Sequence, residues 1–290
     1  KDTQAPAMTD NQPGDDTWRN SNSAVYNVDF ADPGDSLLSK FQVKATTGPN
    51  QTGTLLFDWS DNIISINSSS YSSDWPLAAG HWSLLSSGTN YVSIRIFDNA
   101  GSSTAVTDAF YVRKDTQAPA ITDNQAGESV WRNSNSGVYN IDFADAGGSL
   151  LSKFQLRAST NPGGAGPFSP DWTDNVTGIN SASYAADWAL AAGNWALLPP
   201  GTNYISVRSF DNAGSYTDLP DAFNVLKDTQ NPSGLALPPA YSGALSFNVA
   251  YSSSDAGSAG VEYVKLYYTY QTAAPYTWAQ FGDTFSLSPI

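Results

Sequence analysis

Aspartate is the residue type in this chain with the greatest potential for chemistry. Of its 27 acidic residues only Glu128 and Glu262 are glutamates, so nearly all of them are aspartates. Glutamate favours helices, whereas aspartate favours turns, caps and oxygen-rich cation sites. The chain has no cysteine, which excludes disulfides, thiolate metal sites and a cysteine nucleophile. The chemistry to consider first is therefore the binding of a hard cation such as Ca²⁺ by carboxylates.

A long internal repeat organises these aspartates. The string Lys-Asp-Thr-Gln occurs at Lys1, Lys114 and Lys227, at intervals of 113 residues. The first two copies align without a gap, whereas the third diverges after Pro232 and reaches Ile290. An interval of this length suits a whole domain rather than a solenoid unit. We predict domains at 1–113 and 114–226 and a partial, diverged domain at 227–290, and we expect the natural chain to continue.

Inside each repeat the apolar residues recur with a period of two. Residues 24–30, 38–45 and 91–97 alternate apolar with polar side chains, as strands with one buried face do. A turn signal, Asp-Asn-Ala-Gly, follows at 98–101. Residues 71–85 are ambiguous, because their apolar spacing also allows a short helical turn. The pattern predicts an all-β fold.

Two motifs carry a resemblance to a known family. Gly88-Thr89-Asn90-Tyr91 with the strand after it resembles the tyrosine corner of immunoglobulin-like and fibronectin type III sandwiches. The opening Asp-Thr-Gln-Ala-Pro resembles the domain starts of bacterial immunoglobulin-like repeats in large surface and adhesin proteins. The resemblance implies tandem immunoglobulin-like β-sandwich domains, two full and one truncated, at an extracellular or cell-surface location. It also implies that Tyr91 and Tyr204 are buried and that their hydroxyls bond nearby backbone.

In a sandwich of this kind, the B–C and F–G loops lie at the pole where the chain enters. Carboxylates from three separate stretches would therefore converge there, and converging carboxylates repel unless a cation such as Ca²⁺ lies among them. The candidate ligands are Asp115, Asp145, Asp211 and Asn212 in the second repeat, Asp2, Asp32 and Asp98 in the first, and Asp228 and Asp255 in the third. Calcium-stiffened junctions are also what the resemblance implies. The alternative is that each side chain only caps its own turn.

An enzymatic function is not expected. The only histidine, His81, is replaced by Asn194 in the second repeat, and no Gly-rich phosphate loop or other catalytic motif occurs. The formal charge of −14 repels nucleic acid and anionic membrane surfaces. No apolar run approaches the roughly 20 residues of a membrane span. From its first residues we expect no signal peptide at the start of this sequence.

The tryptophans leave one alternative open. Trp18, Trp59, Trp75 and Trp82 recur in the second repeat, and large sandwiches use tryptophan to fill their cores. Trp59 and Trp172 lie beside turn residues and are expected to be the most exposed, which suits stacking on sugar rings. We therefore expect a non-catalytic structural segment, a spacer, stalk or filament, whose partners are further repeats or neighbouring copies. The alternatives are an adhesin or carbohydrate-binding module for surface glycans and an accessory domain of an enzyme.

Overall fold

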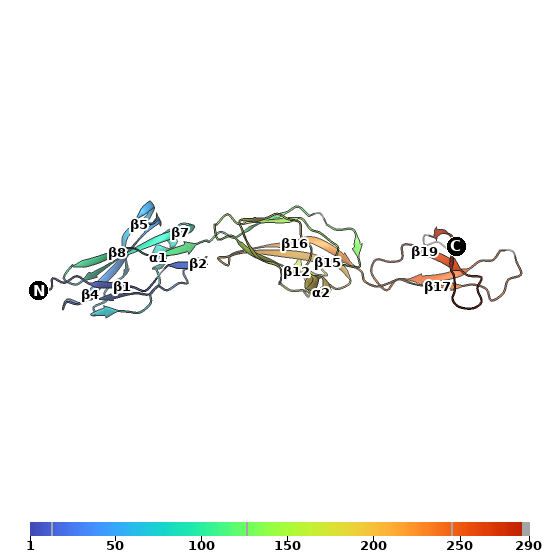
Figure 1. The fold of residues 1–290 in the computed structure, drawn as a ribbon, viewed down its shortest axis with the longest axis horizontal. Coiled ribbons are helices and arrows are strands. Elements are labelled where there is room, and N and C mark those ends of the chain that lie inside the picture. Colours follow the sequence, from blue (N-terminus) through green and yellow to red (C-terminus); the bar gives the residue numbers. More distant parts are fainter. Residues whose placement is uncertain (13, 126, 245, 286–290) are drawn as a thin grey trace.

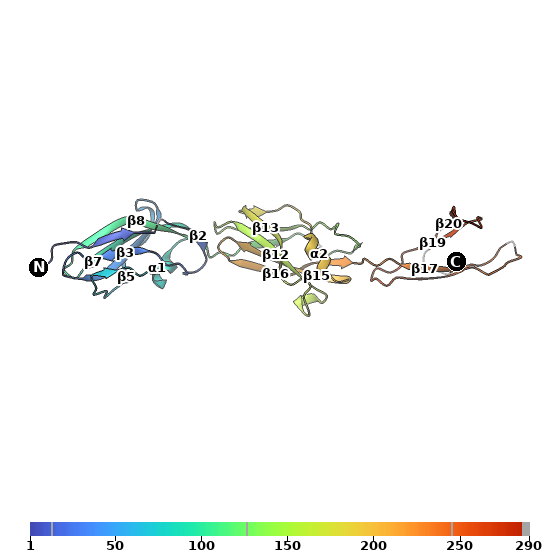
Figure 2. The same ribbon diagram turned by 60° about the horizontal axis from the view of Figure 1, so that its bottom comes forward.

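The computed structural model describes residues 1–12, 14–125, 127–244 and 246–285. The three repeats follow one another along the long axis of the molecule (Figure 1), and the view turned by 60° shows the same order (Figure 2). No strand pairing among the described residues joins one repeat to the next. The domain boundaries themselves stay a prediction.

The first repeat forms two facing sheets. The strands of the five-stranded sheet lie in the order β2-β8-β7-β4-β5, and those of the three-stranded sheet in the order β1-β3-β6. Their bounds are β1 Ala7–Asp10, β2 Asp15–Arg19, β3 Val28–Ala31, β4 Leu38–Gly48, β5 Thr52–Ile63, β6 Ser70–Tyr71, β7 Gly88–Asp98 and β8 Ser103–Lys114. The prediction of an all-β sandwich is confirmed.

The second repeat has the same topology, with sheets β10-β16-β15-β12-β13 and β14-β11-β9. Its strands are β9 Ala120–Asp123, β10 Trp131–Arg132, β11 Ile141–Ala144, β12 Leu151–Ser159, β13 Thr173–Ser181, β14 Ser183–Tyr184, β15 Gly201–Asp211 and β16 Tyr216–Lys227. A 3₁₀ turn, η1 Pro162–Gly164, lies in the loop between β12 and β13. The ambiguous segment of each repeat forms one helical turn, α1 Ala79–Leu84 or α2 Ala192–Leu197.

Each sandwich has its own apolar core. Trp75 is fully buried in the first repeat and packs, with tilted rings, against Tyr26, Phe41 and Phe110. Trp188 makes the equivalent contacts in the second repeat. The expectation that tryptophans fill the core holds for these two and for Trp82, and Trp195 packs against the core of the second repeat, whereas Trp59 and Trp172 lie nearer the surface. Burial of the inward aromatic and aliphatic residues supplies most of the stabilisation of such a fold.

The tyrosine-corner prediction is wrong. Tyr91 and Tyr204 are only half-buried, and neither hydroxyl bonds another residue in the described parts of the chain. The buried residue is the preceding asparagine, because Val92 and the alternate residues after it point inward and a period of two places Asn90 on the same side. The Nδ2 of Asn90, fully buried, donates to the carbonyls of Ser86 and Gly88, at 2.9 and 3.0 Å. Asn203 does the same in the second repeat.

The third repeat shows two separate hairpins. The strands β17 Ser233–Leu237 and β18 Ala250–Ser254 pair with each other, as do β19 Val264–Tyr268 and β20 Ala279–Phe285. By register they correspond to β1, β3, β4 and β5 of the first repeat. No apolar side chain from 229 to 282 is buried where the structure describes the chain. The third repeat therefore has no core of its own in the described residues.

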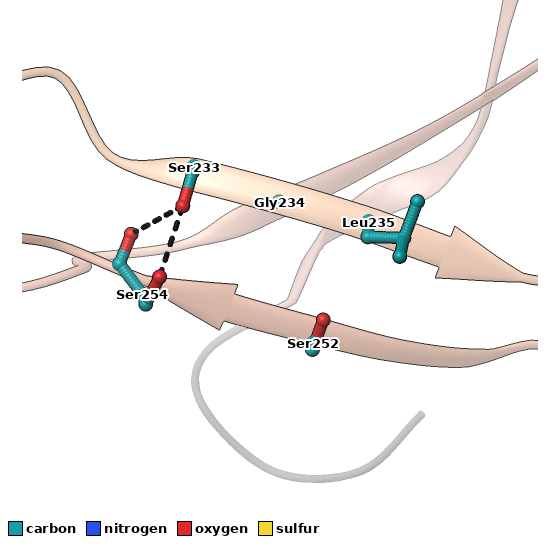
Figure 3. Close-up of a pocket in the computed structure, with 5 residues that line it drawn as sticks. All are labelled: Ser233, Gly234, Leu235, Ser252 and Ser254. Carbon is teal, nitrogen blue, oxygen red and sulfur yellow. Dashed lines mark hydrogen bonds between the residues drawn. The ribbon is translucent and has the colours of Figure 1, made fainter.

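A shallow hollow lies over the first of these hairpins. Figure 3 shows the five residues that line it, Ser233, Gly234, Leu235, Ser252 and Ser254. The hydroxyl of Ser233 bonds the carbonyl and the hydroxyl of Ser254, at 3.3 and 2.9 Å. None of the five carries a titratable group, so the hollow has no acid, base or metal ligand to offer.

Candidate metal centre

Three aspartates of the second repeat meet at one pole of its sandwich. Asp115 directly precedes the chain that leads into β9, Asp145 follows β11, and Asp211 ends β15. Each offers a carboxylate oxygen, and these three oxygens all lie within 4.8 Å of one another. The convergence predicted from the loop positions is therefore present among Asp115, Asp145 and Asp211.

This spacing fits a calcium ion. Ca²⁺ binds oxygens at about 2.3–2.6 Å, so two ligands on opposite sides of one ion are roughly 5 Å apart. Asp115, Asp145 and Asp211 are 0, 6 and 2% exposed. Water cannot screen charges buried this deeply, and three ionised carboxylates this close repel strongly. The cluster therefore favours a bound cation or a bound proton.

Hydrogen bonds fix the three carboxylates in place. The carboxylate of Asp115 accepts the backbone N–H groups of Gln117 and Ser149, at 2.9 and 3.0 Å. Asp145 accepts those of Gly147 and Leu150, at 3.0 and 2.7 Å. The bonds from Gln117 to Asp115 and from Gly147 to Asp145 each span two residues and close a local turn. This is what the alternative interpretation, in which each aspartate only caps its own turn, requires. Capping and convergence are thus compatible, because an oxygen that caps a turn leaves lone pairs free.

Asp211 is the exception within the cluster. Its Oδ1 accepts the N–H of Ser215 at 2.8 Å, but its Oδ2 is buried and has no hydrogen-bond partner. Burial, together with the nearby carboxylates of Asp115 and Asp145, raises the pKa of Asp211 to about 6, against the hydrogen bonds that lower it. In a folded protein, a buried oxygen without a donor usually pairs with a proton, a water molecule or an ion.

The first repeat contains the same arrangement. The carboxylate oxygens of Asp2, Asp32 and Asp98 also lie within 4.8 Å of one another. Asp98 Oδ2, like its counterpart in the second repeat, is buried without a partner. Hydrogen bonds from Ser36 and Gln4 lower the pKa of Asp2. The cluster is therefore a property of the repeat and not of one copy.

The third repeat repeats two members of the cluster. The carboxylate of Asp228 accepts the N–H groups of Gln230 and Ala259, at 2.9 and 2.7 Å, and these bonds lower its pKa. Asp255 accepts the N–H of Gly257 at 3.0 Å. In the first two repeats the third carboxylate comes from the end of β7 or β15, and the described residues 227–244 and 246–285 contain no equivalent strand. Asp228 in the linker and Asp255 in the turn after β18 thus take up their positions without the third carboxylate.

One glycine in each copy makes room for the linker aspartate. A Cβ added to Gly34, Gly147 or Gly257 would collide with the carboxylate of Asp2, Asp115 or Asp228. The loop therefore approaches the carboxylate closely enough for its backbone to donate hydrogen bonds. A side chain at these positions would push the linker aspartate away from the cluster.

Asn212 lies beside the cluster in a different role. Its Nδ2 donates to the carbonyl of Ser149 at 2.9 Å, and its backbone N–H donates to that of Leu150. Asn99 binds Ser36 and Leu37 in the same way. These asparagines tie the turn after Asp98 or Asp211 to the turn after Asp32 or Asp145, and so they hold the carboxylates together.

The preceding repeat covers the cluster of the second repeat. The backbone N–H of Asp115 donates to the carbonyl of Arg19 at 2.9 Å. A Cβ on Gly148 would lie 3.6 Å from the ring of Trp18. Asp115 is accordingly fully buried, whereas Asp2 is half-buried. Residues of the first repeat therefore help to desolvate the site of the second.

Lys114 was not identified from the sequence as a functional residue. It is the last residue of β8, and its Nζ donates to the carbonyls of Trp82 and Leu85 at 2.9 and 2.8 Å. Lys227 makes the same two bonds to Trp195 and Leu198. Burial lowers the pKa of both lysines. The recurrence of Lys before Asp in the repeated string was the available signal.

His81 has a structural position. It is 6% exposed, its ring stacks on Phe57, and its Nδ1 lies 3.1 Å from Oδ1 of Asn62. Asn194, which replaces it in the second repeat, donates from Nδ2 to Oδ1 of Asn175 at 3.3 Å. An amide therefore occupies the equivalent position with an equivalent contact, and no proton transfer is needed there.

Trp59 and Trp172 lie on the outer face of the five-stranded sheets and are half-buried. The guanidinium of Arg95 lies 4.6 Å from the ring centroid of Trp59. Arg157 and Arg208 lie 4.6 and 4.2 Å from that of Trp172. Neither tryptophan is a bare, fully exposed platform.

Comparison with known proteins gave matches among solved structures only. No family model matches the chain, and no curated protein does. Fibronectin(III)-like modules of Clostridium thermocellum CbhA align with 12% identity and a TM-score of 0.31, covering 77% of this chain and 94% of that one. A tetra-tandem repeat from the extending region of a large adhesion protein aligns with 14% identity and a TM-score of 0.32, covering 99% of this chain and 64% of the other.

The calcium-binding domain CBD12 of CALX1.1 also aligns, with 10% identity and a TM-score of 0.20 over 66% of this chain and 76% of that one. Identities and TM-scores this low do not place the chain in any of these families. No helix in the described ranges is long and apolar enough to cross a membrane.

Proposed function

We propose that this chain is a non-catalytic structural segment of an extracellular repeat protein, in which a bound Ca²⁺ stiffens the junction between consecutive sandwiches. The observation that carries the proposal is the double attachment of Asp115. Its backbone N–H bonds Arg19 of the first repeat, and its carboxylate belongs to the cluster of the second. A cation held by Asp115, Asp145 and Asp211 would thus act directly on the residue that joins the two repeats.

The chemistry of the cluster supports a hard cation. The converging ligands are carboxylate oxygens, which Ca²⁺ prefers, and no imidazole or thiolate is among them. An ion there would pair with the free Oδ2 of Asp211 and neutralise charges that otherwise repel. Backbone donors already hold Asp115 and Asp145 in position, so little further ordering would be required on binding.

The residues also support the absence of catalysis. The one histidine contacts Phe57 and Asn62 inside the first sandwich, and an asparagine replaces it in the second. The shallow hollow of the third repeat is lined by serines, a glycine and a leucine. No described group combines a nucleophile with a base, so the clustered carboxylates are the chemistry that the structure offers.

Small-angle X-ray scattering with and without a chelator tests the proposal. We expect chelation to loosen the junction of the first two repeats, so that the scattering profile becomes that of a more flexible chain. Circular dichroism should show that both sandwiches remain folded. Asp211→Asn should remove this response. Asp98→Asn is the matched control, because it alters the cluster of the first repeat and leaves the cluster of Asp115, Asp145 and Asp211 intact. Scattering profiles that do not change on chelation would refute a cation-dependent junction.

A further inference from the structure

The outer face of the second repeat's five-stranded sheet carries alternating aromatic rings and arginines. The order is Phe168, Arg157, Trp172, Arg208 and Tyr216. The successive distances from guanidinium carbon to ring centroid are 4.1, 4.6, 4.2 and 4.4 Å. We call this set the aromatic–arginine ladder. Each contact within about 6 Å is a favourable cation–π interaction, and together they hold the two guanidinium groups in place.

The first repeat carries a shorter form of the same ladder. Arg95 lies 4.6 Å from the centroid of Trp59 and 5.0 Å from that of Phe97. Arg95 occupies the position of Arg208, and Trp59 that of Trp172. The arginine–tryptophan pair is therefore present in both repeats, at equivalent positions of the sequence.

One guanidinium in each ladder forms no ion pair where the structure describes the chain. Arg208 is paired with both carboxylate oxygens of Asp218, at 2.5 and 2.8 Å. Within the described parts of the chain, Arg157 makes no hydrogen bond or ion pair, and Arg95 bonds only Oε1 of Gln42, at 2.6 Å. The chain has 27 acidic and 13 basic residues. Arg95 does lie near Asp58, whose pKa it helps to lower, but Asp58 forms its ion pair with Lys44. Neither Arg95 nor Arg157 is therefore matched by a carboxylate of its own.

The stacking also determines which donors are free. Nε of Arg95 and Nε of Arg157 are buried without a partner, whereas their terminal nitrogens are not among the buried unpaired atoms. A guanidinium held against an aromatic ring presents its N–H groups at its edge, in the fork that matches a carboxylate. The aromatic partners of Arg95 and Arg157 are half-buried, and Tyr216, which lies beside Arg208, is 51% exposed. The surface thus combines an anion-binding fork with partly exposed aromatic rings.

We propose that this outer face binds an acidic polysaccharide, whose anionic groups pair with Arg95 and Arg157 while its sugar rings lie against the neighbouring aromatic side chains. Charge complementarity favours this ligand over a neutral glycan, because a neutral sugar would leave the two forks unpaired. The formal charge of −14 repels an anionic ligand. At physiological salt this repulsion is screened beyond about 8 Å, so only acidic groups close to the site oppose binding.

This inference goes beyond the proposed structural function and does not depend on the cation. Arg157 lies six residues along β12 from Leu151, which pairs with Asp211. At about 3.3 Å per residue the backbone of Arg157 is roughly 20 Å from that of Leu151, which lies at the end of the strand near the cluster. A failure of the metal centre and a failure of this site can therefore be told apart.

Isothermal titration of the 290-residue chain in chelator, with an oligogalacturonate as the carboxylated probe, tests the inference. A heparin oligosaccharide serves as the sulfated probe and a neutral galactan oligosaccharide as the uncharged one. We expect one or both acidic probes to bind and the neutral probe to bind at least about tenfold more weakly. Arg95→Gln/Arg157→Gln should weaken acidic binding by a similar factor. Arg157→Lys, which keeps the charge but not the fork, should restore only part of the affinity.

The matched control is Lys1→Gln/Lys265→Gln, which removes the same number of positive charges outside this face and should change binding by less than about twofold. An equal loss in this control would show non-specific charge attraction and overturn the proposal. Equal binding of the neutral probe, or no binding of either acidic probe, would also overturn it. Binding of the sulfated probe alone would support the anionic site and identify sulfate as its ligand group. Thermal unfolding of each variant shows whether the fold is intact.

Discussion

Lys114 and Asp115 are neighbours in the chain, but their side chains are buried in different repeats. The Nζ of Lys114 donates to the carbonyls of Trp82 and Leu85 at the end of α1 in the first repeat. The carboxylate of Asp115 accepts the N–H of Ser149 in the second. One peptide bond therefore connects two anchored side chains, and no free linker separates the first two sandwiches.

Asp98→Asn/Asp211→Asn should abolish the stabilisation by Ca²⁺. The neutral amide removes repulsion in each cluster, so the cation-free variant should be as stable as the wild type or more stable by about 1 kcal/mol. Calcium should then no longer raise the melting temperature. Scanning calorimetry with and without Ca²⁺ measures this, with Asp218→Asn as a control outside the cluster. A variant that Ca²⁺ still stabilises like the wild type would contradict the ligand assignment.

The cation-free protein should become more stable as the pH falls from 7 to 5. The pKa of Asp211 is raised to about 6 in the folded state, so the folded state binds this proton more readily than the unfolded chain does. The repulsion is therefore relieved as the pH falls through 6, by on the order of 1 kcal/mol. Chemical denaturation in chelator at several pH values checks this.

With saturating Ca²⁺ the pH dependence of stability should reverse, because protons and the cation compete for the same carboxylate oxygens. Stability should then rise between pH 5 and 7. A chelated protein whose stability falls on acidification over the same range would contradict the raised pKa, and Asp211→Asn should flatten the dependence.

Lys114→Met should destabilise the first repeat by about 1–3 kcal/mol. The substitution removes two hydrogen bonds to buried carbonyls and a favourable cation at a helix C-terminus. Lys40→Met is the control, since Lys40 forms a partly exposed pair with Asp61 that should contribute less than about 1 kcal/mol. Urea denaturation measures both. Equal effects of the two substitutions would argue against the anchoring role.

Asn203→Ala should destabilise the second repeat by about 1–3 kcal/mol, whereas Tyr204→Phe should have little effect. The asparagine is fully buried and its Nδ2 donates to the carbonyls of Pro199 and Gly201. The hydroxyl of Tyr204, by contrast, bonds no other residue where the structure describes the chain. Thermal unfolding of the two variants compares them. The opposite ranking would restore the tyrosine-corner interpretation.

Backbone amides of β19 should exchange with deuterium far faster than those of β4. Strand β4 pairs on both sides, with β5 and β7, and its inward residues are buried. Strand β19 pairs only with β20 among the described residues and contributes no buried apolar side chain. Exchange follows the free energy of local opening, which is small without a core. Slow exchange in β19 would indicate that another strand covers it.

The sequence alone was sufficient to predict the repeats, the sandwich and the aspartate cluster. A period of 113 residues is a covalent property, and alternation along a strand reports directly which face is buried. Asp115, Asp145 and Asp211 could be placed together because each adjoins a strand end at the same pole of a sandwich. The period of two would also have identified Asn90 as the inward residue, but the family resemblance drew attention to Tyr91.

Only the tertiary structure decided what surrounds these residues. The burial of Lys114 under α1, the contact of Trp18 with the next repeat and the unpaired Oδ2 of Asp211 all depend on segments far apart in the chain. Strand register likewise decided that Arg157 and Arg208 both stack on Trp172 and that only Arg208 finds a carboxylate. Such contacts follow from the packing of particular side chains across sheets, which no local pattern encodes.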